Sequence, residues 1–188
     1  MARTVKATIV TLWAVAGVVA AAGCGGEAGD KTFAGDGYSF TYPGDWRDRT
    51  EELETDGEAG SLPSTSQVAV APGQEQDLVL TEVGATSPGV TGDNIDGVAA
   101  EIARIVESGF QDADGRMTSG PERVTVGGLP SLRFEGTSVT PAGADVRSRL
   151  TLIYDGRNQY AVNCQFTPSG ADEILAGCDQ ILDGFQVE

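Results

Sequence analysis

The alternation of apolar and polar residues is clearest near the C-terminus, where it predicts a strand followed by a helix. From Gln159 to Phe166 every second residue is apolar, which is typical of a half-buried strand. Beyond this segment apolar residues recur three or four positions apart, which predicts a helix from Gly170 to Leu182 with one buried face. Ser169 and Asp172 have the spacing of a capping box, so we expect them to begin this helix. The apolar stripe consists of Ile174, Cys178, Ile181 and Phe185.

Similar patterns through the rest of the chain predict more strands and one further helix. The helix is expected from Asn94 to Ser108, with Asp93 as its N-cap and Gly109 as its stop. The order is strands, a helix, a run of antiparallel strands and a helix, which indicates an α+β fold with helices packed on an antiparallel sheet. The strands are expected at Tyr38–Tyr42, Gln67–Val70, Asp77–Val83, Arg123–Val126, Leu132–Val139, Val146–Tyr154 and Gln159–Phe166, with a possible polar edge strand between Trp46 and Leu53.

The N-terminus carries an almost unbroken apolar run, residues 7–22, behind Arg3 and Lys6. This run is short for a membrane span and has the layout of a secretory signal. The residues that follow, Ala21 to Cys24, resemble the lipobox of bacterial lipoproteins, in which the cysteine is diacylated and becomes the first residue. The usual pattern prefers Leu where Ala21 stands. An ordinary secretory signal with an incidental cysteine, or an uncleaved signal anchor, are the alternatives.

This interpretation divides the chain into three parts. Residues 1–23 are a lipoprotein signal peptide, residues 24–31 are a flexible tether that begins with the lipidated Cys24, and residues 32–188 form one domain. Two acyl chains suffice for stable anchoring. We therefore expect the protein at the extracytoplasmic face of the cell membrane, attached through Cys24.

Composition narrows the possible functions. The 188 residues include 12 cationic and 28 acidic side chains, for a net charge of −16, and no histidine. The negative charge argues against nucleic acid as a partner, because phosphates require a cationic surface. Without histidine, Ser-His-Asp and Cys-His catalysis and His-ligated metals are excluded. We therefore expect a protein that is not an enzyme and that needs no cofactor.

Cys164 and Cys178 remain after Cys24 is assigned to the lipid. Both point from apolar faces, one on the predicted strand and one on the predicted helix, and an exported protein meets oxidising conditions. A disulfide between them would contribute about 3 kcal/mol. Two buried thiols or a redox pair are the alternatives, although the spacing is too long for a C-x-x-C motif.

Two further groups of residues are candidate binding sites. Residues 112–115 begin like a calcium loop, but Arg116 occupies the position of the next ligand, which favours a simple acidic turn and no metal. Arg147 and Arg149 share one face of a predicted strand, and Arg133 lies on its neighbour with Glu135 on the same side. These arginines form either a cross-strand ladder of ion pairs or an anion-binding patch for phosphate or carboxylate.

Two segments resemble PsbP-like domains. Residues 37–46, with the sequence GYSFTYPGDW, resemble the opening strand of that family. The segments 160–164 and 181–185 resemble its final strand, helix and closing aromatic residue. The resemblance covers about residues 32–188 and implies a three-layer α/β/α sandwich on an antiparallel sheet. Together with the lipid signal it points to the actinobacterial, LpqN-type branch.

Members of this family are mostly accessory or binding proteins without a common catalytic set. The resemblance therefore implies a non-catalytic, lipid-anchored protein that docks an envelope protein partner. A carrier that holds a lipid or glycolipid between sheet and helix is the alternative, and a hydrolase without histidine is a third. The polar stretch from Arg47 to Gln67 is the expected recognition surface.

Overall fold

The computed structural model describes residues 29–35, 37–52, 66–73, 77–86, 90–140, 143–156 and 158–188. The predicted signal peptide, Cys24 and most of the expected recognition surface lie outside these residues. The strands are β1 (Lys31–Gly35), β2 (Tyr38–Tyr42), β3 (Arg47–Asp48), β4 (Ser66–Ala71), β5 (Leu78–Ala85), β6 (Arg116–Val126), β7 (Leu129–Val139), β8 (Asp145–Asp155), β9 (Asn158–Phe166) and β10 (Gln186–Val187), and the helices are α2 (Ile95–Asp112) and α3 (Ala171–Asp183).

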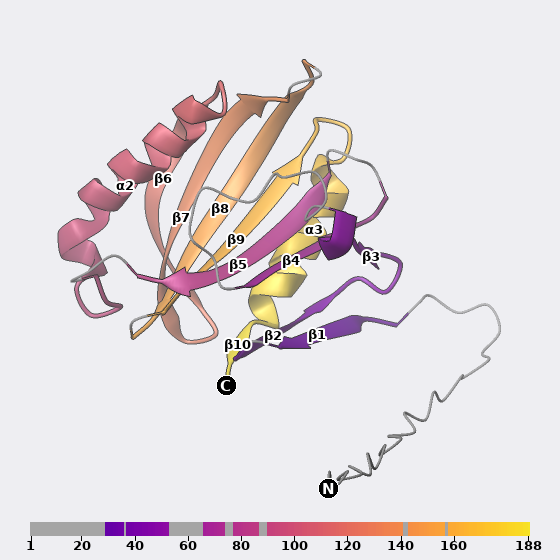
Figure 1. Cartoon of the computed structure of the whole chain (residues 1–188), viewed down its shortest axis with the longest axis horizontal. Coiled ribbons are helices and arrows are strands. Elements are labelled where there is room, and N and C mark those ends of the chain that lie inside the picture. Colours follow the sequence, from indigo (N-terminus) through magenta and orange to yellow (C-terminus); the bar gives the residue numbers. More distant parts are fainter. Residues whose placement is uncertain are drawn as a thin grey trace, which may run out of the picture.

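The strands form two antiparallel sheets. The large sheet has the order β3-β4-β5-β9-β8-β7-β6, and a small sheet has the order β1-β2-β10. Helix α2 packs on β6 and β7, whereas α3 packs on β2, β5 and β9 (Figure 1). The predicted α+β, three-layer α/β/α sandwich is therefore confirmed, and the small sheet shares the α3 layer.

Alternation along the central strands divides the apolar residues between two cores. On β9, Val162 faces the α3 layer and Ala161 faces the α2 layer. The α3 core also holds the aromatic side chains of β2, with Tyr38 and Phe40 stacked among their neighbours. Each face of the large sheet thus carries one helix, and that helix covers only part of the face.

Helix α2 is longer than its pattern predicted. Gly109 was expected to end it, but the helix continues to Asp112 and begins after Asn94, not after Asp93. The last turn is held by Phe110, whose ring packs over the α-carbon of Gly136 on β7, where a Cβ atom would overlap it. A tertiary contact therefore outweighs the local preference of glycine for a helix end.

The predicted capping box of α3 is wrong. The N-cap residue is Gly170, and it makes no side-chain capping hydrogen bond. The turn before the helix is instead held by Asp77, a buried carboxylate that accepts a hydrogen bond from the Thr167 backbone N–H at 2.6 Å. Ser169 Oγ lies 3.0 Å from Thr167 Oγ1. A carboxylate distant in sequence thus fixes the turn that leads into the helix.

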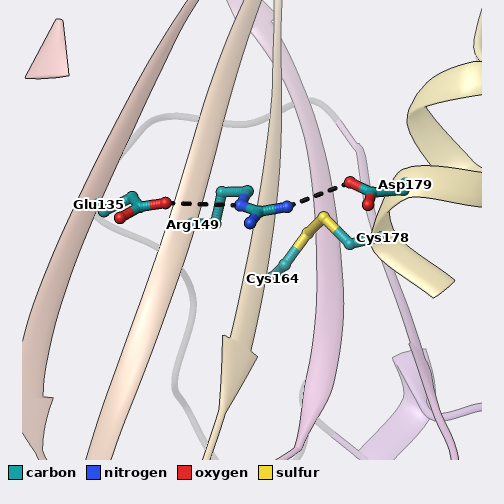
Figure 2. Close-up of a disulfide and its surroundings, with 5 residues drawn as sticks. All are labelled: Glu135, Arg149, Cys164, Cys178 and Asp179. Carbon is teal, nitrogen blue, oxygen red and sulfur yellow. Dashed lines mark hydrogen bonds and ion pairs between the residues drawn. A yellow bond between two sulfur atoms is a disulfide. The ribbon is translucent and has the colours of Figure 1, made fainter. Parts of the chain in front are cut away.

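Cys164 of β9 and Cys178 of α3 meet as predicted and form a disulfide with a Cα–Cα distance of 6.1 Å (Figure 2). Both residues are fully buried. The bond ties α3 to the large sheet, so it fixes the layer that covers β5 and β9.

In the described part of the polar stretch after Trp46, residues 47–52, the short edge strand β3 is followed by helical residues 50–52. Among the described residues, no helix is both long enough and apolar enough to span a membrane.

Candidate functional site

A groove runs between α2 and the large sheet, because α2 packs on β6 and β7 and leaves part of this face of β5, β8 and β9 outside its contacts. Its volume is about 310 Å³, at the small end of the range for ligand-binding pockets. The lining residues come from α2, from strands β5, β7, β8 and β9 and from adjoining turns: Leu80, Glu82, Val90, Ile102, Ile105, Val106, Gly109, Phe110, Ala113, Ser138, Ser148, Leu150, Leu152, Tyr154, Gln159, Ala161, Asn163 and Gln165.

One wall of the groove is apolar. Ile102, Val106 and Phe110 contribute from α2, and Leu150 and Leu152 contribute from β8. Ile105 also lines the groove yet is 56% exposed, which is unusual for a large aliphatic residue. The groove is therefore open to solvent beside Ile105, and an apolar ligand would cover this side chain.

The opposite part of the groove carries polar groups on the strands. Tyr154 is 1% exposed, and its Oη has no hydrogen-bond partner among the described residues. Burial raises the pKa of its hydroxyl to about 12, so the group is neutral at physiological pH. Asn163 Oδ1 on β9 is likewise buried without a partner among those residues. Buried polar atoms without partners are rare, and in a groove they mark positions where a ligand can bind.

Glu82 is the one acidic residue among the residues that line the groove. It lies half-buried on β5 and accepts a hydrogen bond from Gln67 Nε2 at 2.6 Å. Burial raises the pKa of this carboxyl, and the hydrogen bond from Gln67 opposes the rise without cancelling it. The groove therefore disfavours a negative charge at this position.

The raised pKa of Glu82 predicts a pH-dependent contribution to stability. The folded protein holds this proton more tightly than the unfolded chain, whose glutamate has the ordinary pKa of 4.5. The resulting stabilisation is complete below that value and is lost as pH rises through the raised folded value. We expect Glu82→Gln to remove this loss, because the amide oxygen still accepts from Gln67 and never ionises.

Denaturant unfolding of the wild type and E82Q across this acidic window measures the effect. Glu101→Gln, at an exposed position of α2, is the matched control and should keep the wild-type pH dependence. Equal slopes for wild type and E82Q would contradict the prediction.

The sequence analysis missed this groove. Its signal was present in β9, where Gln159, Asn163 and Gln165 alternate with apolar residues, but such polar positions equally suit a solvent-exposed face. Only the placement of α2 turns that face into a groove.

The three arginines predicted as an anion-binding patch share one face of the sheet, as the strand alternation predicted, and this face is the one opposite the groove. Arg149 Nη1 pairs with Asp179 Oδ1 at 3.1 Å, and its Nε lies 3.7 Å from Glu135 Oε1 (Figure 2). Arg133 Nη1 lies 3.9 Å from Glu122 Oε2. Two of the arginines therefore belong to an ion-pair ladder, whereas Arg147 makes no ion pair with the residues that the structure describes.

Among the residues that the structure describes, no cluster of three or more His, Cys, Asp or Glu side chains could hold a metal ion. The segment 112–115 connects α2 to β6, with Asp114 in the left-handed region at φ 52°. The geometry of this segment is that of a tight turn.

No protein-family model and no curated protein sequence matches this chain. Among solved structures, the chain is similar to the cyanobacterial PsbP (CyanoP) of Synechocystis sp. PCC 6803, with 14% identity and a TM-score of 0.60 over 90% of this chain and 99% of that one. It is also similar to LpqN of Mycobacterium tuberculosis, a protein involved in cell envelope biogenesis, with 10% identity, a TM-score of 0.53 and 87% coverage of each chain. Likeness at these identities concerns the fold alone. The chain has the PsbP-like fold that its sequence resemblance implied.

Proposed function

We propose that this protein is a non-catalytic binding protein of the cell envelope that holds an amphiphile in the groove beside α2. The observation that carries the proposal is the buried Tyr154 hydroxyl, which has no partner among the described residues and belongs to a groove with one apolar wall. An acyl or alkyl chain fits against α2 and β8. A polar head fits against Tyr154 and Asn163, which offer hydrogen bonds without charge.

The chemistry of the groove favours an uncharged head group. Glu82 would repel an anion once it ionised, and the neutral hydroxyl of Tyr154 can donate to or accept from an ester, amide or alcohol. Ser138 and Ser148 line the groove, but the chain has no histidine to act as their base. These features support binding over hydrolysis.

The test is the binding of monolaurin, an uncharged single-chain amphiphile. Binding is measured as displacement of the fluorescent hydrophobic dye N-phenyl-1-naphthylamine. We expect the wild type to bind and Tyr154→Phe to bind about five-fold more weakly, because one neutral hydrogen bond contributes about 1 kcal/mol. Without ligand, Y154F should be as stable as the wild type or more stable by up to about 1 kcal/mol, since an unpartnered buried hydroxyl is removed.

Tyr42→Phe is the matched control, because Tyr42 lies on β2, away from the groove lining. It should leave monolaurin binding unchanged. Equal affinities for wild type and Y154F, or no binding by the wild type, would overturn the proposed function.

The proposed location of the protein in the cell rests on the pattern of its N-terminal residues. We propose attachment to the extracytoplasmic face of the cell membrane through a lipidated Cys24, and the resemblance to the actinobacterial branch supports it. Cys24→Ala should release the chain from membranes. An uncleaved signal anchor would keep C24A membrane-bound, and an ordinary secretory signal would release the wild type as well.

Docking to an envelope protein also stays a prediction. The expected recognition surface, residues 47–67, lies largely outside the described residues, so the groove carries the proposal and this segment does not. Crosslinking in intact cells, compared between the full chain and one lacking residues 53–65, tests whether that segment contacts a protein partner.

A further inference from the structure

A second cavity of about 480 Å³ lies on the other face of the large sheet. Helix α3 packs mainly on β2, β5 and β9, and the cavity lies beside it, over the ends of β6, β7 and β8 at Arg116, Thr137 and Arg147. The cavity is bounded by these strands and by Ala171 and Leu175 in the first half of α3. This cavity is separate from the α2 groove, so a binding site here does not depend on the proposed function of that groove.

Four residues of this face lie opposite one another in a single row across the sheet. Arg116 on β6 is paired in register with Thr137 on β7, Thr137 with Arg147 on β8, and Arg147 with Phe166 on β9. All four line the cavity. Neighbouring strands are about 4.8 Å apart, so the backbones of Arg116 and Arg147 are about 10 Å apart. Both long side chains can therefore reach one group above Thr137.

Arg116 and Arg147 differ from the other arginines of this face in their charge partners. Arg133 and Arg149 have carboxylates within 4.0 Å, at Glu122, Glu135 and Asp179. Within the described part of the chain, neither Arg116 nor Arg147 has one, and both are exposed. On a chain of net charge −16, these guanidinium groups form a local site of opposite sign.

The floor of the cavity is apolar beside the two arginines. Phe166 is the last residue of the row, at the end of β9, and Leu175 lines the cavity from α3. A ligand that fills the site therefore needs an anionic group for the arginines and an apolar part for this floor. The planar donor fork of arginine matches the oxygen atoms of phosphate and carboxylate groups.

We propose that Arg116 and Arg147 bind the phosphate group of an amphiphilic phosphate ester whose apolar part packs on Phe166 and Leu175. This assignment revises the patch predicted from sequence. Arg147 stays in the proposed anion-binding site and Arg116 is added to it. Arg133 and Arg149 instead form the ion pairs of the ladder. Arg149 also links the sheet to Asp179 beside the disulfide, which positions the helix that borders the site (Figure 2).

Calorimetric titration with dihexanoylphosphatidic acid, a water-soluble phospholipid, tests the site. We expect Arg116→Gln and Arg147→Gln each to weaken binding about 10-fold or more, as loss of a charge-assisted hydrogen bond does, and the double variant to abolish it. Both positions are exposed, so circular dichroism should show wild-type folding for each variant.

Arg104→Gln is the matched control, because it removes the same charge from an exposed position of α2 on the opposite side of the molecule. It should leave the affinity unchanged. An equal loss for R104Q would show a general charge effect and overturn the site, as would the absence of binding by the wild type.

Two further probes distinguish the source of the phosphate. Inorganic phosphate should bind at least 10-fold more weakly than the phospholipid, because it lacks the apolar part that Phe166 and Leu175 contact. Equal affinity would overturn the assignment of an amphiphile. Sedimentation with phosphatidic acid vesicles then shows whether the same arginines bind a head group in a bilayer, which R116Q and R147Q should weaken and R104Q should not.

Discussion

Replacing Cys164 and Cys178 together with alanine is expected to lower the free energy of unfolding by about 3 kcal/mol. The disulfide closes a loop between residues 14 positions apart, and breaking such a loop restores that much conformational entropy to the unfolded chain. Both cysteines are fully buried between α3 and the large sheet, so the variant also loses some packing. Denaturant unfolding monitored by circular dichroism measures the change.

The wild type unfolded in the presence of reductant provides the comparison, since it removes the bond and keeps both sulfur atoms. We expect it to unfold near the midpoint of the double alanine variant. Two alkylatable thiols at these positions in the unreduced protein, or equal stability of wild type and variant, would show that the bond does not form.

Trp46→Ala is expected to destabilise the protein by about 3 to 5 kcal/mol, the usual cost of truncating a buried tryptophan. Trp46 is 1% exposed and packs on α3 at Gly177, where a Cβ atom would overlap the indole ring. Its backbone carbonyl also accepts a hydrogen bond from Lys31 Nζ at 2.6 Å. The residue therefore joins the small sheet, the edge of the large sheet and α3. Thermal unfolding, monitored by circular dichroism, measures this loss of stability.

Gly177→Val provides the reciprocal test of this contact. The valine side chain should displace the indole and destabilise the fold, because overpacking costs about 1 to 3 kcal/mol. Gly97→Val, at a helical glycine with open space where a side chain would extend, should leave stability unchanged or slightly raised, because valine has a higher helix propensity than glycine. Similar effects of the two valine variants would contradict the contact between Trp46 and Gly177.

The periodicity of the chain was sufficient to predict most of the secondary structure and the disulfide. Strands β4, β5, β8 and β9 and helix α3 all lie where alternation or helical spacing placed them, because each has a regular apolar face that packs in a core. Cys164 and Cys178 lie on such faces, one element apart in sequence. Local pattern and short sequence separation together were therefore enough to predict their contact.

Helix ends were predicted less well, since long-range contacts decide them. Gly109 does not end α2, because Phe110 packs over Gly136 on β7. Ser169 does not cap α3, because the buried carboxylate of Asp77 holds the preceding turn. In both cases a residue far away in sequence outweighs a preference of a few tenths to about 1 kcal/mol.

By itself the sequence determined the fold class, the apolar faces of α3 and of strands such as β5 and β9, the negative charge and the absence of imidazole chemistry. The tertiary structure decided which polar residues share a site. It placed α2 over only part of one sheet face, so Tyr154 and Asn163 line a groove. It also paired Arg149 with acids and placed Arg116 and Arg147 on one row of the sheet, on either side of Thr137. Such neighbours come from strands and helices distant in the chain, and a periodic pattern records only which face a residue occupies.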